Sequence, residues 1–97
     1  MKRFILTTDQ TADEQDKAFY LMLRSRFPNL GWWHHLGETW RFLDPTDSVT
    51  VSDIRDLATR AFPNVPLIPL EVEGNRWAGF GQASDFEWVN YQWEPER

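Results

Sequence analysis

The sequence predicts an α+β fold in which four strands alternate with two helices. Alternating apolar residues predict a strand over 2–8 and another over 67–73. Apolar residues at spacings of three and four predict two amphipathic helices between them. An aromatic-rich run on each side of Gly37-Glu38 predicts a β-hairpin. The chain of 97 residues fits one domain, which we place at 1–93, with a frayed tail over 94–97.

The hairpin is the strongest local signal. Glycine in first place suits a two-residue type II′ turn, which pairs Leu36 with Thr39 and His35 with Trp40. Because side chains alternate along a strand, the hairpin has two distinct faces. The face that we assign to the core carries Trp33, His35, Trp40 and Phe42, and the other carries Trp32, His34, Leu36, Thr39, Arg41 and Leu43.

Capping residues and prolines bound the two helices. Thr11 with Glu14 three residues later has the spacing of a capping box, and the first helix should run to about Arg26 before Pro28. The second helix can be capped by Thr50 or Ser52 and ends at Pro63.

The last part of the chain predicts a strand and a short helix. The strand from Leu67 to Glu73 contains Pro69, which cannot donate to a ladder and so favours the edge of a sheet. Ser84 can cap a final helix over Asp85 to Trp93. Its expected docking residues are Phe86, Val89, Tyr91 and Trp93.

The order strand, helix, strand, strand, helix, strand is that of the split βαβ, or ferredoxin-like, arrangement. We therefore expect a four-stranded antiparallel sheet covered on one face by two helices, plus the short C-terminal helix. Right-handed crossovers place the first and third strands in the centre. An exposed sheet edge and many aromatic residues favour pairing with a second copy, so we expect a homodimer.

Composition excludes several classes of protein. There are 15 acidic and 10 basic residues, and the resulting net charge of −5 argues against broad electrostatic capture of nucleic acid. It leaves a local basic patch open. The chain has no cysteine, which excludes disulfides and thiolate metal sites. No apolar run approaches the length of a membrane span, and we expect a cytoplasmic protein without a membrane partner.

Several short motifs carry a resemblance to a known family. They are the first strand ending in Asp9, the runs 33–36 and 38–40, Leu70-Glu71-Val72, and 77–80. Together they resemble the small bacterial SinR-like proteins, which are related to the CRISPR-associated ferredoxin-like nucleases and the VapD-type toxins. The resemblance implies a ferredoxin-like homodimer. In the nuclease relatives an Asp at the position of Asp9 meets its dimer mate around a divalent metal, although Thr8 replaces the aromatic residue usual before it.

Five residues are candidates for chemistry or binding. Asp9 is the candidate catalytic and metal-binding residue, with Mg²⁺ as the cofactor that hard carboxylate ligands would favour; otherwise it simply ends the strand or caps the helix. In the glycine-rich run 74–81, Trp77 could stack on a base while Arg76 holds a phosphate. His34 and Arg41 face each other in the predicted hairpin and complete the binding candidates.

His34 and His35 are neighbours in a strand, so they should point to opposite faces and cannot chelate one metal together. We expect His35 to be a hydrogen-bonded interior residue. No Ser or Cys arrangement near them indicates a triad.

These observations favour a non-catalytic binding or interaction module that acts as a homodimer. A metal-dependent nuclease that uses Asp9 from each protomer is the first alternative. The second is an acidic protein of a phage or mobile element that inhibits a host defence system by binding a protein or sequestering a nucleotide.

Overall fold

The computed structural model describes residues 1–74, 78 and 80–93. The predicted order of strands and helices is confirmed. The elements are β1 (Lys2–Thr8), α1 (Asp13–Arg26), β2 (Gly31–Leu36), β3 (Thr39–Asp44), α2 (Val51–Ala61) and β4 (Leu67–Val72). A 3₁₀ turn over Ala83–Phe86 and a π-helical turn over Val89–Trp93 follow. The candidate residues Arg76 and Trp77, and the predicted tail over 94–97, lie outside the described residues.

The four strands form one antiparallel sheet in the order β2-β3-β1-β4. The first and third strands are central, as the crossover rule predicts. Pro69 lies in β4, which pairs only with β1 among the described strands. This edge position explains how the strand tolerates a residue that has no backbone N–H group.

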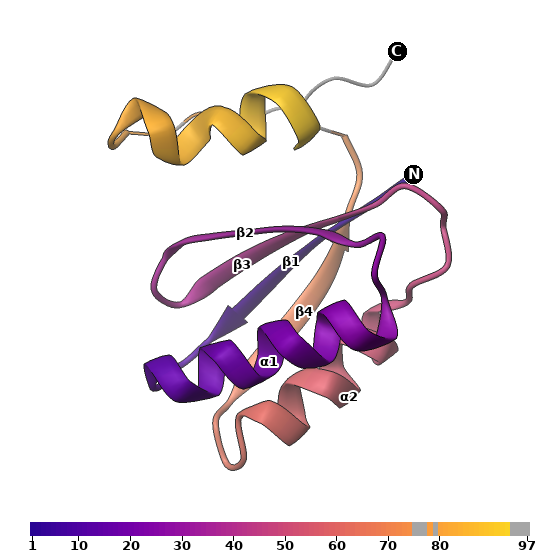
Figure 1. The fold of residues 1–97 in the computed structure, drawn as a ribbon, viewed down its shortest axis with the longest axis vertical. Coiled ribbons are helices and arrows are strands. Elements are labelled where there is room, and N and C mark those ends of the chain that lie inside the picture. Colours follow the sequence, from indigo (N-terminus) through magenta and orange to yellow (C-terminus); the bar gives the residue numbers. More distant parts are fainter. Residues whose placement is uncertain (75–77, 79, 94–97) are drawn as a thin grey trace.

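Helices α1 and α2 lie side by side over one face of the sheet (Figure 1). The main core lies between them and the sheet, and Phe19 of α1 stands at its centre. Its ring packs edge-on against Trp40 at 5.0 Å and lies 5.1 Å from Phe62. Phe4 and Leu6 of β1 are fully buried beneath the same helices.

The C-terminal helical segment lies on the opposite face of the sheet (Figure 1). Val89 and Trp93 are buried there against Trp33, with Ile5 and Val72 packed around them. The predicted helix over Asp85 to Trp93 is present, but it begins two residues earlier with a 3₁₀ turn and ends with a π-helical turn. Ser84 lies inside the first turn and does not precede it, and Gln82 is the N-cap.

The prediction that Tyr91 docks this segment on the sheet is wrong. Tyr91 is 73% exposed, and Trp88 packs against the second cluster of buried residues instead. Val89 and Trp93 are four residues apart and share one face of the segment, whereas Tyr91 is two residues from each and therefore points away from the sheet.

A β-bulge changes the predicted faces of the hairpin. Leu36 pairs with Thr39 as expected, but Trp33 pairs with Arg41, one residue away from its predicted partner Phe42. The register shifts between Trp33 and Leu36. As a result, His34 and His35 both stand opposite Trp40. The prediction that Trp33 and His35 share the helix-side core with Trp40 is wrong, because one extra residue moves the side chains before the bulge to the other face.

The caps of the two main helices differ. Thr50 caps α2, with its Oγ1 accepting from Asp53 N at 3.1 Å and Asp53 Oδ2 accepting from Thr50 N at 2.9 Å. The predicted Thr11–Glu14 capping box is wrong. Ala12 is the N-cap of α1, and its N–H donates to the side chain of Gln15 at 2.9 Å.

Candidate binding site

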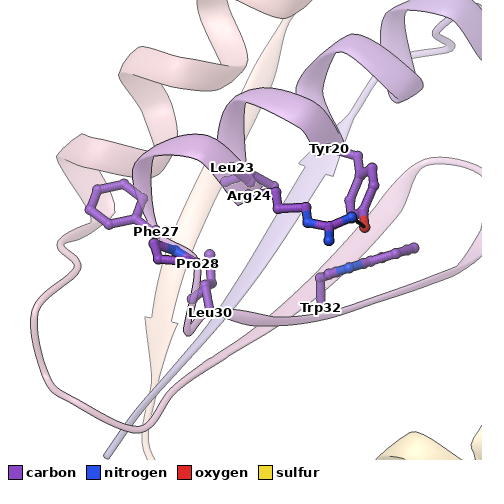
Figure 2. Close-up of a pocket in the computed structure, with 7 residues that line it drawn as sticks. All are labelled: Tyr20, Leu23, Arg24, Phe27, Pro28, Leu30 and Trp32. Carbon is purple, nitrogen blue, oxygen red and sulfur yellow. Dashed lines mark hydrogen bonds between the residues drawn. The ribbon is translucent and has the colours of Figure 1, made fainter.

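A groove opens between the second half of α1 and the start of β2 (Figure 2). We call it the α1–β2 groove. It is lined by Tyr20, Leu23, Arg24, Phe27, Pro28, Leu30 and Trp32. Its cavity of about 110 Å³ is large enough for a single side chain.

Aromatic side chains form the walls of the α1–β2 groove. Tyr20 and Trp32 face each other with ring centroids 4.9 Å apart, and Arg24 Nη1 donates to the Tyr20 hydroxyl at 3.3 Å. Trp32 is 41% exposed, although its ring also lies 5.9 Å from the buried Trp40. The groove therefore offers a half-exposed indole and a guanidinium to a partner.

Strand β2 runs beside this groove and is an edge of the sheet, paired only with β3 among the described strands. Its residues Gly31–Leu36 include no Lys, Arg, Asp, Glu or Pro. Natural proteins usually protect an edge strand with such residues, and β2 has only the bulge. An unprotected edge next to an aromatic groove can add a strand from a partner.

The two histidines of β2 lie on different sides of the sheet. The ring of His34 stacks on Trp40 at 3.8 Å, and its Nε2 lies 3.1 Å from Gly37 O. His35 is exposed and its Nδ1 lies 3.2 Å from Asp85 Oδ1. The expectation of an interior His35 is wrong, because the bulge turns it toward the C-terminal segment.

Asp9 lies at the end of β1 and is exposed. Its backbone N–H donates to Pro66 O at 3.0 Å, and it lines a shallow groove that also contains Glu38. It does not cap α1, whose N-cap is Ala12. Within residues 1–74, 78 and 80–93, no three His, Asp or Glu side chains gather as metal ligands. A metal role for Asp9 stays a prediction.

Arg41 lies on the face of the sheet that the C-terminal segment covers, away from His34. Its guanidinium stands between Trp33 and Trp93, 5.6 and 5.4 Å from their ring centroids. The sequence predicted that His34 and Arg41 would face each other, and the bulge separates them. Arg41 instead faces Trp33 across the strand pair.

Sequence reasoning missed Tyr20 and Arg24, which complete the α1–β2 groove. Their spacing of four residues places them on one face of α1, and this was the only signal available. Their meeting with Trp32 depends on the register of β2, which the bulge sets.

The fold and these surfaces define an α+β protein with an antiparallel sheet that packs apolar side chains on both faces.

Comparison with family models, with curated proteins and with solved structures finds no match for this chain. No helix within the described ranges is long and apolar enough to cross a membrane.

Proposed function

We propose that this chain is a ferredoxin-like binding module that acts without turnover and pairs with a second copy through β2. The element order and the strand order β2-β3-β1-β4 support the ferredoxin-like arrangement. The resemblance to SinR-like proteins implies the same arrangement. The observation that carries the proposal is the uncharged, proline-free edge strand β2 beside the α1–β2 groove.

Charge favours β2 over β4 as the pairing edge. A two-fold interface brings the same patch of both copies together, so any charge in it faces its own equivalent. β2 carries no carboxylate or ammonium group, whereas β4 contains Pro69 and Glu71. A protein with a net charge of −5 is best joined where its surface is neutral.

The same pairing disfavours the nuclease alternative. In a dimer joined through β2, the two β1 strands stand five strand spacings apart, which is about 24 Å. Mg²⁺ binds its ligands at about 2 Å. Asp9 of each protomer then cannot share one metal ion, and the shallow groove that holds Asp9 and Glu38 would have to act alone.

Substitution of Trp32 by lysine tests the proposal. Wild-type protein should run as a dimer in size-exclusion chromatography with light scattering, and Trp32→Lys should shift it to the monomer because the charge faces its copy across the edge. The matched control is Leu70→Lys, which places the same charge on the other edge at a residue 53% exposed. It should leave the dimer intact.

Far-UV circular dichroism must first show that both variants are folded. A wild-type protein that stays monomeric at high concentration, or a Trp32→Lys variant that stays dimeric, would contradict pairing through β2.

A further inference from the structure

Arg41 is half-buried beside two aromatic rings on the face of the sheet opposite α1 and α2. Trp33 of β2 and Trp93 of the C-terminal segment lie on its two sides, at 5.6 and 5.4 Å from ring centroid to guanidinium carbon. Stacked rings satisfy the faces of a guanidinium but none of its N–H groups, which lie in its plane. The buried Nε–H of Arg41 therefore needs an acceptor in that plane.

The described residues supply no such acceptor. Arg41 has no ion pair or hydrogen bond within residues 1–74, 78 and 80–93, and its Nε is buried without a partner. Burial lowers the pKa of Arg41 from its usual value. Arg3, on the same face, differs because its Nε donates to Trp93 O at 3.0 Å.

A cavity of about 100 Å³ adjoins Arg41. Its other lining residues within the described part of the chain are apolar: Trp33, Leu36, Ala78, Phe80, Phe86 and Val89. Trp33 is held in place, because its Nε1 donates to Asp85 O and Phe86 stacks on it at 6.3 Å. A preformed apolar cavity with one convergent charged group has the character of a small-molecule site.

Charge and size define the ligand. An unpaired guanidinium prefers a carboxylate, which can accept two parallel N–H bonds from its edge. A closed, dry cavity of about 150 Å³ holds a benzene ring. The cavity beside Arg41 is smaller, but it is open on one side. It therefore fits a single ring or a short branched chain. A nucleotide is too large for it.

We propose that the cavity beside Arg41 binds a small apolar carboxylic acid, with the carboxylate on the Arg41 guanidinium and the apolar part against Trp33, Leu36 and Phe86. This site lies on the opposite face from the α1–β2 groove and does not depend on the proposed dimer.

Benzoate is the probe, and the Arg41 side chain is the reporter. We would titrate the full-length ¹⁵N-labelled protein with benzoate and follow the Nε–Hε cross-peak that is absent in Arg41→Lys. A saturable shift is expected, with a dissociation constant on the order of 1 mM for a ligand of this size. Benzyl alcohol, which keeps the ring without the charge, should bind at least about tenfold more weakly.

Three variants separate the ligand site from general effects. Arg41→Lys keeps the charge but loses the planar fork and should weaken benzoate binding about tenfold. Because this variant lacks the Arg41 signal, its titration follows the indole Nε1–H cross-peak of Trp33, which lines the same cavity. Arg24→Lys, the matched control in the α1–β2 groove, should bind as wild type. Leu36→Glu changes a residue that is 55% exposed, so the fold should survive, and its carboxylate should compete with benzoate for Arg41.

The outcomes are distinct. Loss of benzoate binding in Leu36→Glu with wild-type binding in Arg24→Lys supports the site. The proposal is overturned if no saturable shift occurs in the millimolar range, if benzyl alcohol or inorganic phosphate binds as well as benzoate, or if Leu36→Glu binds benzoate as wild type does.

Discussion

Asp44 is a single residue that organises the connection from the sheet to α2. It is 1% exposed, and its two carboxylate oxygens accept three hydrogen bonds. Oδ1 accepts from the Thr46 backbone and hydroxyl at 3.1 Å each, and Oδ2 accepts from Val49 N at 2.8 Å. The Asp44 side chain thereby supplies the hydrogen-bond acceptors that the backbone of a loop cannot supply to these N–H groups.

We predict that Asp44→Ala lowers the free energy of unfolding by about 3 kcal/mol, because it leaves buried N–H groups without acceptors. Asp44→Asn keeps one oxygen acceptor and should lose less. Urea denaturation measures both, with Asp56→Ala on the exposed side of α2 as the control, expected to change stability by at most about 0.5 kcal/mol. Equal losses in Asp44→Ala and Asp56→Ala would refute this role for Asp44.

The same residue marks a limit of sequence reasoning. The run 44–48 is readily predicted as a polar turn from its Asp, Pro, Thr and Ser content. Nothing in the sequence says that the first of these carboxylates is buried. Burial follows from the position of Asp44 at the end of a central strand, opposite Lys2 of β1, and this position is a tertiary property.

At the level of elements, the two main helices offer a matched comparison of caps. Thr50 makes a reciprocal capping box with Asp53, whereas Ala12 begins α1 with no side-chain acceptor of its own. Both residues have the extended backbone that an N-cap requires, with φ and ψ of −116° and 163° at Thr50 and of −88° and 152° at Ala12.

We predict that Thr50→Ala destabilises the protein by about 1 kcal/mol and that Ala12→Ser stabilises it by about 0.5–1 kcal/mol. The serine hydroxyl would accept from a first-turn N–H group that lacks a side-chain partner. Thermal and urea unfolding would measure both changes. If Ala12→Ser gives no gain, the Gln15 side chain, which accepts from Ala12 N, already satisfies this helix end.

The elements were largely predictable, and their faces were not. Hydrophobic spacing and the prolines after each helix place the helix ends well, since both signals are local. The position of the hairpin turn was also correct, because Leu36 and Thr39 pair as expected. The predicted type II′ conformation was wrong, because Gly37 does not have the positive φ that this turn requires at its first central residue. The bulge beyond the turn has no local signal in the sequence. Its one inserted residue places Trp32 on the helix side of the sheet, where Trp33 was predicted. The groove and the Arg41 cavity both follow from that exchange.

For the whole molecule, the important feature is that the sheet has two cores of unequal size. The larger cluster holds Phe4, Phe19 and Trp40 under two regular helices, and the smaller holds Trp33, Val89 and Trp93. β1 contributes to both, with Leu6 on one face and Ile5 on the other. The smaller core is covered by short turns of 3₁₀ and π type, whose hydrogen-bond geometry is poorer than that of an α-helix.

The difference in size and regularity between the two cores predicts that the C-terminal segment opens without unfolding of the sheet. Native-state hydrogen exchange should give the amides of residues 89–93 an opening free energy at least about 2 kcal/mol below that of the β1 amides. Trp93→Ala should lower the protection of residues 83–93 and leave the relative protection of α1 and α2 unchanged, because those helices pack on the other core. Equal protection in β1 and in the C-terminal segment would instead mean that the two cores form one cooperative unit. The Arg41 cavity would then be a rigid part of the fold, since its wall of Phe86 and Val89 could open only when the whole sheet unfolds.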